Sequence, residues 1–129
     1  LEFYGKNLGL TFQIADDTLD YNSELKLFGK EIGNDFFEGK VTLPLILLYQ
    51  KSKSNEKKEF KDLFKKKDRS VEDFKNVLLM IKKYNIIFEC YRKAEHFINL
   101  ASNSLSIFEQ SKEKDMLQGL TSFSLERTF

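Results

Sequence analysis

Three aspartates lie close together in the segment FQIADDTLDY, residues 12–21, whose other members are mostly apolar. Asp16 and Asp17 are neighbours, and Asp20 lies three positions after Asp17. Carboxylates this close repel one another, so the pattern is favourable where a positive charge offsets the repulsion. Paired carboxylates on a rigid helix suit Mg²⁺, which takes one or two of them and completes its shell with water and phosphate oxygens. We therefore predict Asp16, Asp17 and Asp20 as metal ligands.

Helical geometry places other residues on the same face. With about 100° of rotation per residue, Asp16, Asp20 and Gln13 share a face with Gly5 and Gly9. We expect this face to border an apolar stripe made of Leu8, Phe12, Ala15 and Leu19. Each glycine costs a helix about 1 kcal/mol relative to alanine, but it leaves room for a bulky ligand. A DDxxD string also occurs on solvated helix faces, so the segment that follows has to support this interpretation.

That segment, GKEIGNDFFEGKVTLP, supplies positive charge. It carries Lys30 and Lys40, with Asp35 and Glu38 between them. Compact lysine ammonium groups suit phosphate oxygens, and glycines let the backbone approach an anion closely. Carboxylates for a metal, followed by lysines for phosphates, predict a Mg²⁺–diphosphate site.

Helices are expected to position these residues. The spacing predicts a helix over residues 3–20, followed by a long polar loop over 21–41 that holds three of the six glycines. A loop of that length within a domain is usually functional. Thr42 is expected to cap the next helix, which tolerates Pro44 in its first turn.

The later helices are expected to be amphipathic. Residues 51–68 are rich in lysine, with an apolar seam of Phe60, Leu63 and Phe64, so we interpret them as a solvated helix rather than a nucleic-acid-binding surface. Ser70, with Asp73 at a capping-box position, is expected to begin another helix, whose apolar face is Phe74, Val77, Leu78 and Ile81. Two more helices are predicted, over residues 86–108 and 112–126.

Composition agrees with a helical fold. The 129 residues are 41% hydrophobic and include 13 Phe but only one Pro and six Gly, which favours long helices over a turn-rich β fold. We predict a single all-α domain over residues 1–129. The net charge of +1 gives no electrostatic reason to expect a nucleic-acid partner.

The remaining candidates for chemistry are assigned no active role. The lone Cys90 cannot form an intramolecular disulfide and is predicted to be a buried, inert thiol. His96, the one histidine, is expected at a helix surface. No apolar run reaches the roughly 18 residues of a membrane span, so we predict no integral membrane segment and a cytoplasmic protein. The chain starts at Leu1 inside a helical pattern without a cap, which suggests a start within something longer.

The two acidic and basic segments resemble a known family. YGKNLGLTFQIADDTLDY and GKEIGNDFFEGKVTLPLILLY resemble the second aspartate-rich motif and the following loop of the trans-prenyltransferases, in particular the long-chain, octaprenyl-type polyprenyl diphosphate synthases. The shared elements FQ, DDxxDY, GK, GxD, EGK and TLP occur in order between residues 4 and 49. Further on, AEHFINLASNSLSIF resembles the AExxxxxA helix of the family.

The resemblance implies an all-α fold whose helices surround a deep central cavity. It also implies a reaction in which an allylic prenyl diphosphate loses its diphosphate with the assistance of Mg²⁺. Isopentenyl diphosphate then attacks the allylic cation, and loss of a proton gives a trans product that is longer by one isoprene unit. Long-chain polyprenyl diphosphates of this kind serve isoprenoid and quinone side-chain biosynthesis, and the family usually forms homodimers.

The resemblance also implies roles for the aspartates. Asp16 matches the principal metal ligand of the second motif, and Asp20 matches a residue that supports the metal directly or through its bound water. Asp17 matches a residue that hydrogen-bonds to those waters. Arg127 lies where some relatives have a basic C-terminus near isopentenyl diphosphate.

The other site residues are carried over in the same way. Lys30 matches a lysine that contacts the allylic diphosphate, and Lys40 matches another lysine near the phosphates. Gln13 matches a residue beside the diphosphate, and Phe12 one that lines the cavity near isopentenyl diphosphate. Asp35 matches a loop aspartate that we expect to orient the lysines.

One departure from the family limits these expectations. The family has two aspartate-rich motifs facing each other across the cavity, and only the second is found here. We expect the C-terminal half of a synthase, inactive by itself, from a full-length enzyme, a split or decaying gene, or a small subunit that needs a partner. The alternative is a non-catalytic helical interaction protein that retains the scaffold. An unrelated phosphohydrolase is disfavoured by the lysine loop.

Overall fold

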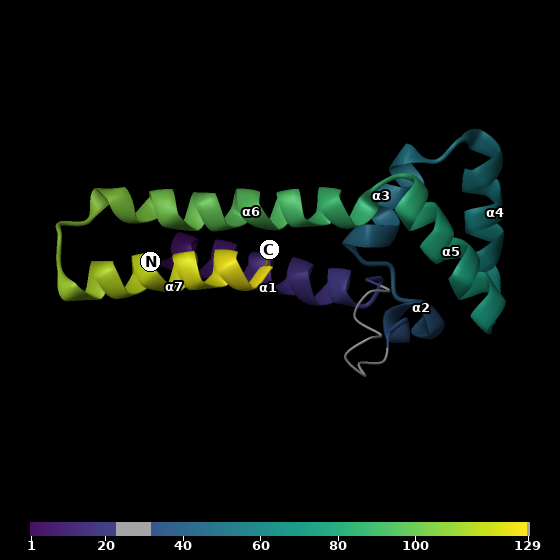
Figure 1. Cartoon of the computed structure of the whole chain (residues 1–129), viewed down its shortest axis with the longest axis horizontal. Helices are drawn as coiled ribbons and strands as arrows, with labels where there is room; N and C mark the ends of the chain where they lie inside the picture. Colours follow the sequence, from purple (N-terminus) through teal and green to yellow (C-terminus); the bar gives the residue numbers. More distant parts are fainter. Residues whose placement is uncertain (23–31, 129) are drawn as a thin grey trace. The chain divides into compact units, whose positions relative to one another are not determined.

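The computed structural model describes residues 1–22 and 32–128, with side chains as far as Leu125. Within these residues all regular structure is helical, as the sequence predicts (Figure 1). The elements in chain order are α1 (Glu2–Leu19), α2 (Asn34–Glu38), α3 (Leu43–Lys51), α4 (Ser54–Lys65), α5 (Val71–Lys83), α6 (Ile86–Ser104), the 3₁₀ turn η2 (Leu105–Ile107) and α7 (Lys112–Thr128).

The chain divides into two compact units. The first consists of Leu1–Ala15 and Tyr91–Phe129, and the second of Asp16–Cys90. Because α1 and α6 each cross this division, both units contain part of each helix. The last turn of α1, with the aspartates, belongs to the second unit together with α2–α5.

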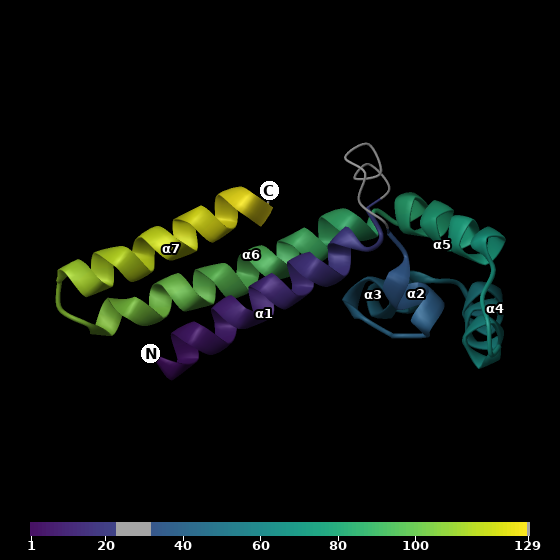
Figure 2. The ribbon, with the colours of Figure 1, turned by 90° about the horizontal axis from the view of Figure 1, so that it is seen from below.

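Within the first unit, α6 and α7 run side by side in opposite directions (Figures 1 and 2). Tyr4 and Leu8 of α1 are buried with Ala101 and Leu105, and Leu117 of α7 packs against them. The Tyr4 hydroxyl donates to the Leu117 carbonyl at 2.7 Å. Apolar contact and a satisfied phenol therefore join three helices that lie far apart in the sequence.

The buried stripe of α1 differs from the predicted one. Phe12 is 48% exposed, and Ala15 and Leu19 are only half-buried, so that part of the prediction is wrong. Polar residues are buried instead, and Thr11 is one of them because its hydroxyl donates to the carbonyls of Asn7 at 3.0 Å and Ala94 at 3.3 Å. The buried residues of α1 and the turn after it are Tyr4, Asn7, Leu8, Thr11, Ile14, Thr18 and Tyr21.

This shift of phase changes the surroundings of the glycines. Gly5, Gly9 and Asp16 are exposed, and by the helical repeat their face lies across α1 from the buried stripe, not beside it as predicted. A Cβ added at Gly5 or Gly9 would meet nothing within 4 Å. The side of α1 that carries Gly5 and Gly9 is therefore exposed, and no described side chain packs on these two glycines.

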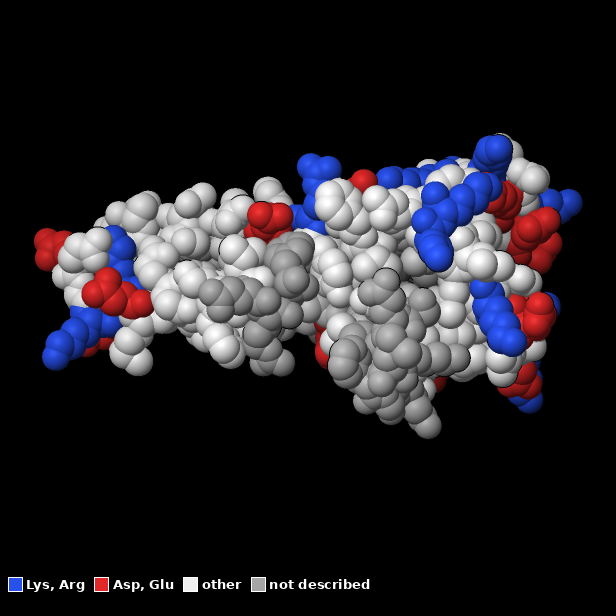
Figure 3. All heavy atoms as spheres, viewed as in Figure 1, with Lys and Arg blue, Asp and Glu red and all other residues white. Residues whose placement is uncertain are grey.

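Helices α3, α4 and α5 in the second unit largely follow the predictions. Thr42 lies at the N-cap of α3 with Pro44 in the first turn, although the Thr42 hydroxyl makes no capping hydrogen bond. Ser70 and Asp73 form the predicted capping box, with the Asp73 N–H donating to Ser70 Oγ at 3.0 Å and the Ser70 N–H to Asp73 Oδ2 at 2.9 Å. Phe60 is buried in the seam of α4, and basic and acidic side chains are interspersed over the surface of α4 and α5 (Figure 3).

Two boundaries need correction. The predicted loop over 21–41 contains the short helix α2, while residues 23–31 of that loop lie outside the described residues. The helix predicted over 86–108 ends at Ser104 and continues as the 3₁₀ turn. Both segments are short helices held by local hydrogen bonds, and the spacing of apolar residues does not reveal such bonds.

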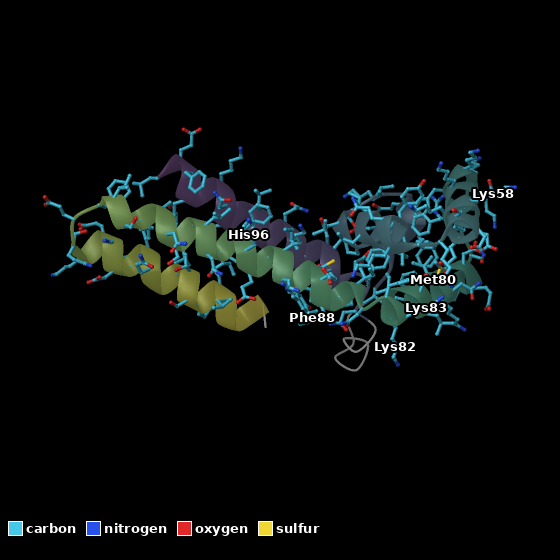
Figure 4. The ribbon with its side chains drawn as sticks, turned by 90° about the horizontal axis from the view of Figure 1, so that it is seen from above. Lys58, Met80, Lys82, Lys83, Phe88 and His96 are labelled. Atoms are coloured by element: carbon cyan, nitrogen blue, oxygen red, sulfur yellow. The ribbon has the colours of Figure 1, made fainter. Side chains whose placement is uncertain are left out.

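The single cysteine and the single histidine lie where the sequence places them. Cys90 is fully buried, and burial raises the pKa of its thiol to about 11. His96 is exposed on α6 (Figure 4), with its ring 5.4 Å from that of Phe97. No described helix is both long and apolar enough to cross a membrane.

Candidate functional site

The DDxxDY motif spans the C-terminal end of α1 and the turn that follows. Thr18 and Tyr21 are both buried, at 0% and 1% exposure, and the Tyr21 ring packs 6.1 Å from that of Phe74. Asp16 is consequently exposed, while Asp17 and Asp20 are half-buried. Because Thr18 and Tyr21 are buried, the aspartates beside them in the sequence point toward the surface.

Asp20 caps the N-terminal end of α2. Its Oδ1 accepts from the N–H groups of Gly33 and Asn34, both at 3.2 Å, and its Oδ2 accepts from the Asp35 N–H at 2.7 Å. The Gly33 N–H also donates to the Asp20 carbonyl at 2.9 Å. The first N–H groups of a helix lack partners within it, and a carboxylate both accepts from them and complements the positive end of the helix dipole.

A glycine is required immediately before α2. Gly33 has φ of +92°, and a Cβ there would lie 2.8 Å from the Phe74 ring. The left-handed backbone and the close approach of the ring both exclude larger residues. Gly33 is the glycine of the GxD element, so this part of the motif serves the turn that brings Asp35 to Asp20.

The other end of α2 leads directly to Lys40. The Gly39 N–H donates to the Phe36 carbonyl at 3.0 Å, and the Lys40 N–H donates to the Asp35 carbonyl at 2.8 Å. Gly39 is left-handed, with φ of +78°, as is common just after the end of a helix. Lys40 Nζ lies 4.0 Å from Asp35 Oδ1 and its side chain is 66% exposed, so the ion pair is weak.

Negative charge concentrates around Asp35 and Tyr21. Burial, and then the nearby Asp20 carboxylate, raises the pKa of Asp35, while Lys40 opposes the shift. Burial, followed by Asp20, Asp35 and Asp17, raises the pKa of Tyr21. The Tyr21 hydroxyl is buried without a hydrogen-bond partner in the described part of the chain. For both groups burial is the largest cause of the shift in pKa, and the neighbouring carboxylates add to it.

The raised pKa of Asp35 makes stability depend on pH. Between its unfolded pKa, about 4, and its higher folded pKa, the folded state binds the proton more tightly, so this carboxyl lowers stability as pH rises. Asp35→Asn should therefore be more stable relative to the wild type at neutral pH than at acidic pH. Urea unfolding of both proteins over a pH series measures this difference. A difference that does not vary with pH would contradict the prediction.

The structure brings some of the predicted site residues together. Asp20, Asp35 and Lys40 are connected by the contacts given above. Phe12 and Gln13 are exposed and belong to the first unit, so they are not placed relative to this cluster. Asp16 and Asp17 lie near the end of α1 in the same unit as the cluster. Lys30 and the side chain of Arg127 lie outside the described residues.

Arg69 is a residue that the sequence reasoning missed. Its guanidinium contacts the C-terminal end of α2, yet it lies well beyond the recognised motifs. The available signal was its residue type, since it is an arginine within a segment whose other cations are lysines. Arginine is favoured where several acceptors must be bound in a fixed geometry.

The aspartates of the DDxxDY motif have the oxygen donors that a hard divalent cation prefers. Asp16 is exposed and Asp17 half-buried, whereas both oxygens of Asp20 accept backbone hydrogen bonds. Among the described residues no three His, Cys, Asp or Glu side chains converge to hold a metal. One or two carboxylates suffice for Mg²⁺ when water and phosphate oxygens supply its other positions, so the chemistry of Asp16 and Asp17 suits this ion.

Comparison with known proteins identifies similar sequences. The model of the polyprenyl synthetase family matches residues 1–81. The all-trans-nonaprenyl-diphosphate synthase (geranyl-diphosphate specific) of Rhodobacter capsulatus is 32% identical over 98% of this chain and 38% of its own length. The octaprenyl diphosphate synthase of Haemophilus influenzae is 27% identical over 100% of this chain and 39% of its own length.

Solved structures show the same similarity. A polyprenyl synthase from Roseobacter denitrificans matches 97% of this chain and 40% of its own, with a TM-score of 0.83 and 29% identity. The polyprenyl synthase of Caulobacter crescentus, in complex with calcium and isoprenyl diphosphate, matches 98% of this chain and 38% of its own, with a TM-score of 0.80 and 32% identity. The chain thus spans less than half the length of the relatives it matches.

Proposed function

The chain belongs to the polyprenyl synthetase family, and on that premise we propose that it supplies the second aspartate-rich side of a trans-polyprenyl diphosphate synthase active site. The proposed substrates are an allylic prenyl diphosphate and isopentenyl diphosphate, and the product is a long-chain trans-polyprenyl diphosphate. Asp16 is the principal Mg²⁺ ligand, and Asp17 and Asp20 support the ion. Lys30 and Lys40 bind the diphosphate.

One observation carries this proposal. The last aspartate of the motif bonds to the Asp35 N–H, and the Asp35 carbonyl accepts from the Lys40 N–H. The backbone N–H and carbonyl of Asp35 thus connect Asp20 of the DDxxDY motif to Lys40. A diphosphate held by a metal needs carboxylates and cations on the same side of the ligand, and α2 provides that connection within a single unit.

The proposed chemistry is departure of a diphosphate. Diphosphate is a poor leaving group unless its negative charge is neutralised, and Mg²⁺ held by the aspartates would supply neutralising charge. Lys40 contributes a further positive charge. Its exposed ammonium is held only weakly by Asp35, at 4.0 Å, so it can move to a phosphate oxygen at little cost.

The relatives support the ligand class and indicate what is missing. The Caulobacter crescentus synthase binds calcium and isoprenyl diphosphate, a divalent cation and a diphosphate of the kinds proposed here. Because the chain corresponds to 38% of that protein's length, we propose that the opposing carboxylates come from a region equivalent to the remainder. The chain alone is then inactive. Homodimer formation and a cytoplasmic location, both expected for the family, belong to the same proposal.

The test is binding of inorganic pyrophosphate in the presence of Mg²⁺, measured by isothermal titration calorimetry. Removing the metal ligand with Asp16→Ala is expected to weaken binding by at least about tenfold, because charge-assisted contacts are lost. Asp62→Asn is a matched control that removes one negative charge from the exposed face of α4 and should leave binding unchanged. Equal binding by the wild type and Asp16→Ala would contradict the proposal and favour a non-catalytic scaffold.

A further inference from the structure

We propose that Arg69 is a positioning residue for Lys40, acting through the C-terminal end of α2. The role of Lys40 as a phosphate ligand rests on the proposed function. The mechanical part of the inference, that Arg69 fixes the backbone from which Lys40 extends, rests on contacts within the second unit alone.

Arg69 makes three hydrogen bonds to main-chain carbonyls. Its Nε donates to the Phe36 carbonyl at 2.9 Å and its Nη2 to the Phe37 carbonyl at 3.4 Å, both in α2. Its Nη1 donates to the Lys66 carbonyl, just after α4, at 3.0 Å. The last carbonyls of a helix carry partial negative charge and can each accept more than one hydrogen bond. The Phe36 carbonyl already accepts from the Gly39 N–H, and Arg69 adds a second, charged donor to it.

Packing fixes the guanidinium in this position. Its central carbon lies 5.3 Å from the centre of the Phe64 ring, within the range of a cation–π contact. On another side, a Cβ built on Gly39 would lie 2.8 Å from Nη2. The absence of a side chain at Gly39 therefore lets Arg69 lie directly against the backbone that leads to Lys40.

The short helix passes this restraint to Lys40. A five-residue helix is not stable by itself, because nucleation is costly and few hydrogen bonds repay it. Asp20 holds its first N–H groups, and Arg69 holds its last carbonyls. The Lys40 N–H is bonded to the Asp35 carbonyl within this held segment, so the Lys40 backbone is fixed when both ends are fixed.

Lysine is a poor substitute for Arg69. A guanidinium presents several donors in a rigid plane, whereas an ammonium is a point charge on a flexible stem. Arg69→Lys keeps the charge but cannot reach three carbonyls in this arrangement, and Arg69→Gln removes the charge as well. We therefore expect graded effects, smaller for lysine than for glutamine.

The first measurement is amide hydrogen exchange by NMR on the full chain without ligand. In Arg69→Gln the amides of Gly39 and Lys40 should lose about tenfold or more of their protection, because local opening becomes easier. The Tyr84 amide, bonded to the Met80 carbonyl at the end of α5 at 3.0 Å, should keep its protection. Lys58→Gln, on the exposed face of α4 (Figure 4), is the control variant and should change none of these amides.

The second measurement asks whether Arg69 acts through Lys40. Binding of inorganic pyrophosphate with Mg²⁺ is compared in wild type, Arg69→Gln, Lys40→Gln and the double variant. Arg69→Gln is expected to weaken binding about threefold to tenfold, and to have no further effect once Lys40 is replaced, because coupled residues are not additive. Arg69→Lys should restore part of the loss.

The two measurements separate the possible failures. Unchanged protection of Gly39 and Lys40 in Arg69→Gln would overturn the inference. An additive loss in the double variant would also overturn it, since Arg69 would then act on the diphosphate independently of Lys40. If wild type did not bind pyrophosphate at all, the proposed function would fail, and the exchange measurement would still decide whether Arg69 holds the Lys40 backbone.

Discussion

Replacing Phe36 with alanine is expected to lower the free energy of unfolding by about 3–5 kcal/mol. Phe36 is 0% exposed. Its ring lies 5.5 Å from Phe37, 5.7 Å from Phe64 and 5.3 Å from Phe74, measured between ring centres. Truncation removes apolar burial and aromatic contacts, and leaves a cavity where helices α2, α4 and α5 meet. Urea unfolding followed by circular dichroism measures the loss.

The neighbouring phenylalanine provides the control. Phe37 lies in the same short helix and contacts Phe74 at 5.4 Å, but it is 38% exposed. Phe37→Ala should therefore cost clearly less than Phe36→Ala, because less surface returns to water and a partly open site leaves little cavity. Equal losses for the two variants would contradict the central position assigned to Phe36.

Replacing Asp20 with alanine is expected to cost about 2 kcal/mol of stability, the upper range for loss of a helix cap. The variant leaves the N–H groups of Gly33, Asn34 and Asp35 without the carboxylate that now accepts from them. Because α2 is only five residues long, it has little capacity to remain folded without its cap. We expect the amide resonances of these three residues to shift toward those of an unstructured chain, measured by NMR without metal.

Asp16→Ala is the matched control for this effect. It removes an aspartate one turn earlier in the same motif, from an exposed position, and should leave both stability and the α2 amides unchanged. Asp20→Asn should be intermediate, since an amide oxygen still accepts but carries no charge. A loss of stability in Asp16→Ala as large as that in Asp20→Ala would show that the cap does not account for the effect.

Both predictions concern residues that stabilise α2. Its hydrophobic anchor, Phe36, and its cap, Asp20, are both required to hold a helix too short to be stable by itself. The third support, Arg69, comes from beyond α4. Lys40 lies just after α2, so its position depends on Phe36, Asp20 and Arg69. None of these three residues contacts a phosphate under the proposed function.

Much of the helical order could be predicted from the sequence because it is encoded locally. The apolar seam of α4 and the face of α5 repeat at the helical period, and their central residues Phe60, Phe74 and Val77 are buried. Ser70 and Asp73 lie close enough in sequence to form a capping box without help from elsewhere. The family motif likewise lies within one continuous stretch, so the membership it suggested could be tested directly and was confirmed.

The buried face of α1 could not be predicted as reliably. The period was correct, but Thr11 and Thr18 are fully buried in place of Phe12, because a hydroxyl can satisfy itself on nearby carbonyls, as that of Thr11 does. Hydrophobicity alone assigns the larger aromatic residue to the core. Which face of α1 is buried depends on the helices that pack against it, and these helices lie far away in the sequence.

The sequence by itself determined most of the helices, the family and the residue types of the proposed Mg²⁺–diphosphate site, because periodicity, caps and motifs are properties of neighbouring residues. Only the tertiary structure decided that the last aspartate of the motif caps α2, and that Arg69 closes the other end. The physical reason is distance along the chain. Asp20 and Asp35 are 15 residues apart, and Arg69 and Phe36 are 33 apart, so folding alone brings these donors and acceptors together.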